Sequence, residues 1–396
     1  MSTISWFIPS LIKGSGGHRT ILQHAHYLES KGHSCTIYLE DEHGIGNPAD
    51  KILSLFNMHF NSVVYGWKNA IASDVAIATV WYSAAFVASL PFNCKKAYLV
   101  QDYEAWFNPM GDAYLMAENS YQYGLTPITI GRWLKHTLKE RFNVEGYHFE
   151  FGANLDIYKK DVLVVKEKAI CFIYQPDKPR RCSRIGIEAL GIVKHRVPDV
   201  KIYLYGSDVK ENVWFEHQNL GLINLKECND LYNKCTVGLC LSSSNPSRIP
   251  FEMMASGLPV VELWRDNNLY DLPDSATLLA KQTPESLAEA LIELLADPAR
   301  CAMMSKAGVD FMESRNLSVE TEQFSSALEK FLAGGTPDSK PVQRMYQGRL
   351  VEAAITRQAT LAALHIVSPS RLRKLAMLLP IGLQGPLKKL YRIVKR

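Results

Sequence analysis

Short runs of apolar residues alternate with longer amphipathic stretches along the first half of this chain. The expected strands there cover residues 4–8, 35–39, 75–80, 97–100 and 128–130. A helix is expected at 18–30, where one face collects Ile21, Leu22, Ala25 and Leu28. Because short apolar runs alternate with amphipathic segments, the pattern predicts a parallel sheet covered by crossover helices.

The alternation lapses at residues 151–168 and then starts again. In the second half, the expected strands cover residues 169–174, 201–205, 237–241 and 260–263. The expected helices cover residues 185–197, 226–234, 250–256 and 284–295. We therefore predict an α/β fold with two facing Rossmann-like domains, at 1–150 and 169–333, joined by a linker at 151–168. Ligands are expected in the cleft between the domains, at the carboxyl ends of the strands.

Charge is distributed unevenly along the 396 residues. The net charge is +4, but residues 336–396 carry 12 Lys and Arg against 2 Asp and Glu, which leaves −6 on the rest of the chain. An acidic body argues against a general nucleic-acid binder, whose basic surface would lie on the folded body. Residues 334–396 are therefore expected to form a separate basic tail.

Two stretches of this tail, 369–380 and 386–396, place apolar residues opposite Lys and Arg at helical spacing. Short amphipathic basic helices favour an anionic membrane surface. Docking onto an acidic partner, such as another assembly enzyme, or onto the protein's own acidic body is the alternative. No apolar run approaches the roughly 20 residues of a membrane span.

The eight cysteines form no Cys-x-x-Cys pair and show no spacing typical of a zinc site. Most lie within apolar runs, which predicts buried free thiols and a reducing compartment. The first residues lack the positive charges that open a signal peptide. We therefore expect a cytoplasmic protein.

A glycine-rich turn follows the first expected strand and runs directly into a helix. Gly16 and Gly17 lie in it, in the run Lys-Gly-Ser-Gly-Gly-His-Arg. Glycines let the backbone approach a ligand closely, and a helix N-terminus offers unpaired N–H groups to an anion. The run matches neither a dinucleotide fingerprint nor a P-loop, so an ordinary strand-to-helix turn is the alternative.

The segment 242–261 predicts a polar loop, a short helix opened by Pro250, a glycine stop at Gly257 and a buried strand. Glu252 lies in the first turn of that helix, where a carboxylate can accept two sugar hydroxyls. Alternatively, Glu252 only stabilises the helix dipole, which is worth about 0.3–1 kcal/mol.

This segment resembles the donor site of retaining family 4 glycosyltransferases, which have the GT-B fold. The family's Glu-x7-Glu, followed by an Ala-x-Gly-x-Pro-Val-Val run, is matched at Glu252 and at residues 255–261. The resemblance implies that Glu252 holds the ribose of a nucleotide-sugar donor. The family's first Glu falls at Ser244, so recognition of the sugar hydroxyls by Ser243, Ser244 and Asn245 must differ.

Further segments narrow the resemblance to the rhamnosyltransferases that build bacterial surface glycans from dTDP-L-rhamnose. They cover residues 7–20, 101–106, 179–181 with 185–190, and 249–254. The resemblance extends over about residues 1–333. It implies an acceptor-side domain at 1–150, a donor domain at 169–333 and retention of anomeric configuration.

The resemblance also suggests roles for charged residues elsewhere. Arg180 and Arg181 would contact the pyrophosphate bidentately, opposite the backbone of the glycine turn, or else form a solvated pair. Asp102 and Glu104 would bind or deprotonate the acceptor hydroxyl. The neighbouring Trp106 suits either stacking on a sugar ring or a buried lid. No metal and no cofactor are expected, although residues 102–104 mimic an Asp-x-Glu metal motif.

Together these features predict a glycosyltransferase that moves a hexose, L-rhamnose from dTDP-L-rhamnose, onto a growing lipid-linked surface polysaccharide. It would act in the cytoplasm, at the inner face of the cell membrane. Two other classes remain open. One is a nucleotide-sugar epimerase of the same fold, and the other is a glycan-assembly scaffold without catalytic activity.

Overall fold

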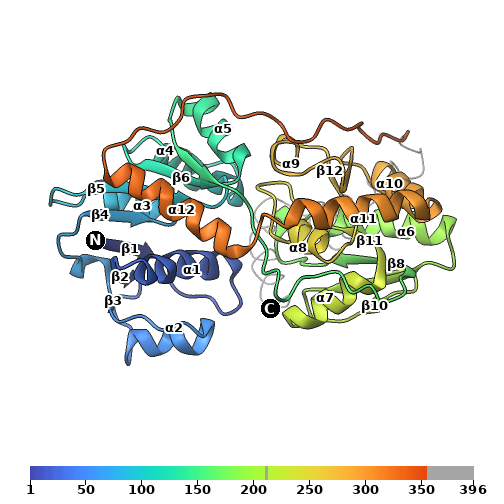
Figure 1. Ribbon diagram of the computed structural model, residues 1–396, viewed down its shortest axis with the longest axis horizontal. Helices are drawn as coiled ribbons and strands as arrows, with labels where there is room; N and C mark the ends of the chain where they lie inside the picture. The colour runs from blue at the N-terminus through green and yellow to red at the C-terminus, as the bar shows by residue number, and fades with distance from the viewer. Residues whose placement is uncertain (210–212, 355–396) are drawn as a thin grey trace, which may run out of the picture. The chain divides into compact units, whose positions relative to one another are not determined.

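The computed structural model describes residues 1–209 and 213–354, which contain two parallel sheets (Figure 1). The first sheet has seven strands in the order β3-β2-β1-β4-β5-β6-β7. They are β1 (Thr3–Ile8), β2 (Ser34–Leu39), β3 (Val63–Tyr65), β4 (Val75–Ala78), β5 (Lys95–Val100), β6 (Thr126–Ile130) and β7 (Tyr147–Phe149). In the central pairings, Ile4 of β1 lies opposite Cys35 and Val75. All five strands predicted for this half are confirmed, with ends shifted by up to two residues.

Helices connect these strands as crossovers. They are α1 (Gly16–Ser30), α2 (Pro48–Phe56), η1 (Trp67–Asn69), α3 (Trp81–Ala88), η2 (Glu104–Phe107), α4 (Asp112–Ser120) and α5 (Arg132–Phe142). Local signals set several boundaries: Asn47 accepts a hydrogen bond from Ala49 N at the start of α2, and Ser15 caps α1. The apolar face predicted for α1 is buried.

The second sheet has six strands in the order β10-β9-β8-β11-β12-β13. They are β8 (Glu167–Ile173), β9 (Lys201–Tyr205), β10 (Gln218–Asn219), β11 (Cys235–Leu239), β12 (Val260–Leu263) and β13 (Thr277–Ala280). Its helical segments are η3 (Pro179–Arg181), α6 (Ser183–Arg196), α7 (Leu225–Lys234), α8 (Ile249–Ala255), α9 (Asp266–Asp271), α10 (Pro284–Ala296) and α11 (Pro298–Met312). The strand expected at 237–241 begins two residues earlier, and an irregularity in its pairing with β8 lies between Cys235 and Val237.

Apolar side chains fill both faces of the two sheets, as expected for parallel strands covered by helices. Close packing limits side-chain size at some positions: a Cβ on Gly186 of α6 would lie 2.2 Å from the Phe172 ring. All eight cysteines are free thiols, and six of them are buried, as the sequence predicts. Within the described part of the chain, no helix combines the length and hydropathy that a bilayer span requires.

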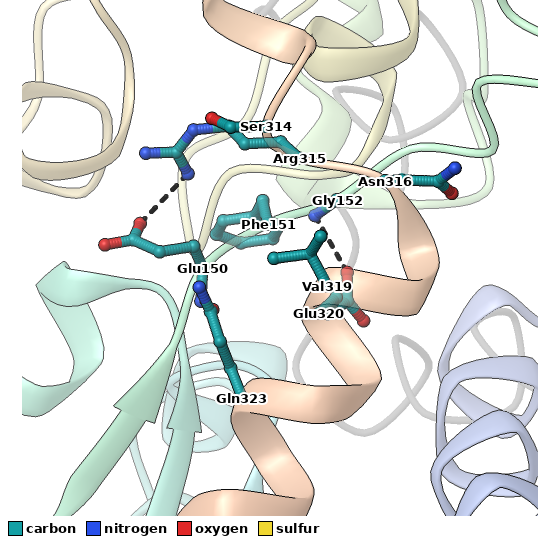
Figure 2. Close-up of a pocket in the computed structure, with 9 residues that line it drawn as sticks. All are labelled: Glu150, Phe151, Gly152, Ser314, Arg315, Asn316, Val319, Glu320 and Gln323. Atoms are coloured by element: carbon teal, nitrogen blue, oxygen red, sulfur yellow. Dashed lines mark hydrogen bonds and ion pairs between the residues drawn. The ribbon is translucent and has the colours of Figure 1, made fainter.

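Two connections between the sheets run side by side. Ala153 N donates to Arg315 O at 3.0 Å, and Leu317 N donates to Ala153 O at 3.1 Å. Figure 2 shows Glu150 directed at Arg315, and Glu320 accepting from Gly152 N, around a cavity of about 80 Å³. The chain thus leaves the first sheet and returns to it through one hydrogen-bonded pair of segments.

Helix α12 (Leu317–Leu332), the last one within residues 1–354, packs against α1 and β7 of the first sheet (Figure 1). The sequence prediction had grouped these residues with the second domain. The domain boundaries themselves stay predictions. The physical reason for the placement is apolar contact, because Phe324 lies 5.8 Å from the Trp6 ring and 5.6 Å from the Phe149 ring.

Residues 335–352 belong to the same compact unit as both sheets. Tyr147 donates to Gly335 O at 2.8 Å, Tyr346 is buried, and Val351 N donates to Leu279 O at 3.0 Å beside β13. The first part of the predicted basic tail therefore packs on the folded body. The predicted helices at 369–380 and 386–396 lie outside the described residues.

Candidate functional site

Asp102 joins loops from the two sheets. It follows β5, and its carboxylate accepts hydrogen bonds from Ser244 Oγ at 3.0 Å and from Asn245 N at 2.9 Å, in the loop that follows β11. Its own neighbour, Tyr103 N, is a third hydrogen-bond donor at 2.8 Å. The carboxyl ends of the central strands therefore meet at one anionic side chain, which is where parallel sheets bind ligands.

The loop after β11 is held in place by polar contacts along its length. Asn245 Nδ2 donates to Gln101 O at 3.0 Å, and Ser242 Oγ donates to Asn245 O at 2.8 Å. Ser242 N donates to Glu262 Oε1 at 2.9 Å, and Asn267 Nδ2 donates to Ser242 O at 3.1 Å. Such a network fixes Ser243, Ser244 and Asn245 before any ligand arrives.

Arg180 and Arg181 of η3 lie beside this loop. Ser243 N donates to Arg180 O at 2.9 Å, and the Arg180 guanidinium carbon lies 4.7 Å from the centre of the Phe107 ring. Within the described part of the chain, the buried Arg180 Nε and Arg181 Nη1 have no hydrogen-bond partner. Burial and the adjacent positive charge of Arg181 lower the pKa of Arg180. Two adjacent cations with unused donors are suited to bind a polyanion.

The electrostatics of Asp102 reflect these neighbours. Burial raises its pKa, while the Asn245 N–H, the positive charge of Arg180, the Ser244 hydroxyl and the charge of Arg181 oppose the rise. The groups that oppose the rise in pKa are therefore the same ones that would surround a bound ligand.

Glu104 is placed differently from Asp102. It is buried, and Oε2 accepts from Trp81 N at 2.6 Å at the first turn of α3. Burial raises the pKa of Glu104 to about 8, so the protonated form predominates at neutral pH. This carboxyl group caps α3 inside the first lobe, which here means β1–β7 and their helices.

Helix α1 begins at Gly16, two residues before the expected start at 18, so Gly16 and Gly17 lie in its first turn and not in the turn before it. A Cβ on Gly16 would meet nothing within 4 Å, and a Cβ on Gly17 would lie 3.7 Å from Gln101 Nε2. Gln101 directly precedes Asp102, so the exposed first turn of α1 lies beside the loop after β5.

Glu252 lies in α8, where the sequence placed it. Burial raises its pKa to about 7, opposed by the charge of Arg248 and by a hydrogen bond to Tyr158. Glu252 as a whole residue is half-buried.

Sequence reasoning missed two polar residues of this region. Glu262 is fully buried in β12 and organises the loop after β11 through Ser242 N. The feature of the sequence that could have identified Glu262 is a carboxylate inside the apolar run Val-Val-Glu-Leu. Arg248 reaches the first lobe, donating to Thr20 Oγ1 at 3.0 Å and to Gly152 O at 2.9 Å, with Glu320 as its counter-ion. No local pattern indicates that contact, since its partners are distant in the chain.

Comparisons with known proteins bear on the fold and on the second sheet. Residues 168–292 match the family model described as "WsaF, C-terminal domain". The chain is 24% identical over 349 residues to the O-antigen biosynthesis protein RfbC of Myxococcus xanthus. That alignment covers 83% of this chain and 27% of the relative, so the chain spans about a quarter of the relative's length.

Solved structures share the fold at low sequence identity. Sucrose-phosphate synthase from Thermosynechococcus elongatus superimposes with a TM-score of 0.64 at 15% identity, covering 85% of this chain and 100% of that one. Anabaena Alr3699/HepE in complex with UDP-glucose gives 0.64 at 13% identity, covering 83% and 100%. The chain therefore has the GT-B fold of glycosyltransferases. Within that class, its second sheet carries the match to the WsaF C-terminal domain.

Proposed function

We propose that this protein is a glycosyltransferase that moves a hexose from a nucleoside-diphosphate sugar onto a bacterial surface glycan. The observation that carries the proposal is the pair Arg180 and Arg181, whose unused buried donors face a fixed polar loop at the carboxyl ends of the strands. Negative charge develops on the leaving diphosphate during transfer, and preorganised cations stabilise that charge.

In this proposal the backbone N–H groups at Gly16 and Gly17 bind the diphosphate from the first lobe. A helix N-terminus that begins with two exposed glycines offers such groups without side-chain obstruction. Glu252 accepts from the pentose of the nucleotide, which in dTDP offers the 3′-hydroxyl, and the raised pKa of its carboxyl group makes this contact sensitive to pH near neutrality.

Asp102 supplies the carboxylate that the family pattern places at position 244. Its Oδ2 lies 3.0 Å from Ser244 Oγ, within the reach of a longer acidic side chain at that position. We assign Asp102 to the hydroxyl groups of the reacting sugars, as ligand and as acceptor of the attacking hydroxyl's proton. Glu104 supports α3 instead, since its carboxyl oxygen is used by Trp81 N.

The donor sugar we propose is L-rhamnose carried by dTDP, which rests on the similarity of residues 7–20, 101–106 and 249–254 to rhamnosyltransferases. The name of the Myxococcus relative supports a role in O-antigen assembly. The acceptor would then be a lipid-linked glycan. Membrane attachment through the basic residues after 354 is part of the same proposal.

The deciding experiment combines nucleotide binding with product analysis. A thermal-shift panel of dTDP, UDP, GDP and ADP should show one nucleotide raising Tm, because a ligand at 100 times its Kd adds about 2.7 kcal/mol of stability. Incubation with dTDP-L-rhamnose and a lipid-linked oligosaccharide should then yield dTDP and an acceptor extended by one deoxyhexose.

Other products would identify the alternatives. Conversion of the nucleotide sugar without any acceptor would identify an epimerase. Nucleotide binding with no turnover of any of the sugars would identify a scaffold. Absence of binding to all four nucleotides would contradict the proposal as a whole.

A further inference from the structure

A cavity of about 480 Å³ lies beside the proposed site. Three tryptophans line it, Trp106 from η2, Trp133 from α5 and Trp264 after β12, together with Arg265 and Asn267. The volume falls within the range of about 300–1,000 Å³ that is usual for ligand pockets.

The aromatic rings form a surface that a ligand can reach. The Trp106 and Trp133 rings are 5.4 Å apart, tilted by 33°. Trp133 is buried beneath, whereas Trp106 keeps 37% of its surface exposed. A large aromatic side chain exposed at a concave site offers much apolar contact area at little entropic cost.

Two buried polar atoms of the same cavity lack a hydrogen bond within the part of the chain that the structure describes, although the Arg265 guanidinium carbon lies 5.6 Å from the centre of the Trp106 ring. Among the described residues, the buried Asn267 Oδ1 and Arg265 Nε have no hydrogen-bond partner, and Asn267 is 1% exposed. Buried polar atoms are normally paired, so these two indicate a ligand that donates to the amide oxygen and accepts from the guanidinium. A hydroxyl group does both.

The cavity adjoins the transfer site through two shared segments. Asn267 holds the carbonyl of Ser242, at the start of the loop that carries Ser244. Phe107, next to Trp106 in η2, lies under the Arg180 guanidinium. A chain of sugars whose end reaches Asp102 can therefore extend into the cavity.

From these observations we propose that the cavity binds the acceptor glycan, with pyranose rings stacked on Trp106. The proposal rests on the glycosyltransferase function given above. Pyranose rings fit because one face carries only C–H groups, which pack on an aromatic ring, while the rim carries hydroxyls. The cavity is thus assigned to the sugar units next to the one that is extended.

Saturation-transfer NMR tests the cavity without any nucleotide or turnover. The probes are methyl glycosides of rhamnosyl-rhamnose, rhamnosyl-galactose and rhamnosyl-N-acetylglucosamine. We expect saturation of the C–H face of at least one probe, and a Kd that rises about tenfold in Trp106→Ala, which corresponds to 1.4 kcal/mol. Trp106→Phe should recover most of the affinity.

Trp214→Ala is the matched control, because Trp214 is 66% exposed and packs against Gly191 on the second lobe (β8–β13 with their helices). It should bind the probes like the wild type, and both tryptophan variants should bind dTDP equally. No saturation of any probe, or unchanged binding in Trp106→Ala, would overturn the cavity assignment. Probe binding without nucleotide binding or transfer would instead leave the cavity assignment standing and contradict the proposed function.

Discussion

Arginines of the second lobe lie at two places where segments of both lobes meet. At one place the guanidinium has hydrogen-bond partners and a counter-ion, and at the other it has donors that no described residue uses. Arg248 is bonded to the carboxylate of Glu320, to Gly152 O and to Thr20 Oγ1, and Glu320 is only 2% exposed. Arg180 and Arg181 keep buried N–H groups without partners in the described residues. Removing the counter-ion of a buried, hydrogen-bonded cation destabilises the fold, whereas a pair of cations with unused donors beside a fixed loop is available to a ligand.

The Arg248 contact should have the largest effect on stability. Glu320→Gln leaves the buried guanidinium without a counter-ion, which costs about 3–5 kcal/mol. Chemical denaturation should show this loss of unfolding free energy. The matched control is Glu289→Gln, which breaks the exposed pair with Arg196 and should cost about 0–1 kcal/mol. Equal losses in the two variants would refute the distinction.

The arginine pair should affect turnover instead. Replacing both Arg180 and Arg181 with Gln should lower kcat by about 10²–10³-fold, since each preorganised donor to a developing charge contributes strongly. Tm should stay within a few degrees of the wild type, because no residue in the described ranges accepts a hydrogen bond from either guanidinium. Rates of dTDP release from the sugar donor measure the effect. A large drop in Tm with unchanged kcat would show instead that the two arginines serve stability and not turnover.

Moving the acidic side chain from position 102 to position 244 tests whether Asp102 of the first lobe replaces the carboxylate that the family pattern places at 244. Asp102→Ser should lower kcat by about 10²-fold, in the range of a lost acid–base group. The double variant Asp102→Ser with Ser244→Glu should recover part of that loss. The control Ser244→Glu alone places two carboxylates together and should be inactive. A double variant no better than Asp102→Ser would contradict the exchange.

Glu252 should have a moderate effect on nucleotide affinity. Glu252→Gln should raise the Kd of dTDP about tenfold, which is 1.4 kcal/mol. Calorimetric titration of dTDP measures it. An unchanged Kd would exclude Glu252 from the nucleotide site.

The pKa of Glu252 also has a consequence for stability. It is raised to about 7 in the folded state, so the folded chain retains a proton that the unfolded chain loses above about pH 4.5. Its contribution to stability is therefore present at low pH and lost as pH rises through 7. The Tm of Glu252→Gln relative to wild type should accordingly increase between pH 5 and pH 8.

Glu104 should have the smallest effect of these residues. Because its pKa is raised to about 8, its carboxyl group is mostly neutral at pH 7, and Gln keeps an oxygen that accepts from Trp81 N. Glu104→Gln should change kcat by less than about threefold, whereas Glu104→Ala should cost about 1–3 kcal/mol by leaving that N–H unpaired. A hundredfold loss of kcat in Glu104→Gln would restore it to a catalytic role.

Much of the fold could be predicted from local pattern. The nine expected strands correspond to nine of the thirteen in the described residues, because each is an apolar run bounded by polar or glycine residues. The four edge strands β3, β7, β10 and β13 were missed, since two to four residues carry little periodicity. Helices α2 to α5 were not predicted; in α3 and α4 a weak or mixed apolar spacing obscures the buried face.

The candidate site was predictable only in part. Arg180, Arg181 and Asp102 follow strands, and strand ends can be located from sequence. The different environments of Asp102 and Glu104 could not be predicted. The two residues are only two positions apart in the sequence, but Asp102 precedes η2 and Glu104 begins it, and their side chains have different partners. Arg248 was also unpredictable, because its carboxylate partner Glu320 lies 72 residues away.

The sequence by itself determined the alternation of strand and helix, the glycine turn at α1 and the uneven distribution of charge, since each depends on neighbours in the chain. Tertiary structure alone decided which charges are saturated, that Asp102 meets Ser244, and that three distant tryptophans line one cavity. The physical reason is that burial and hydrogen-bond partners set the state of a polar group, and both come from segments far apart in sequence.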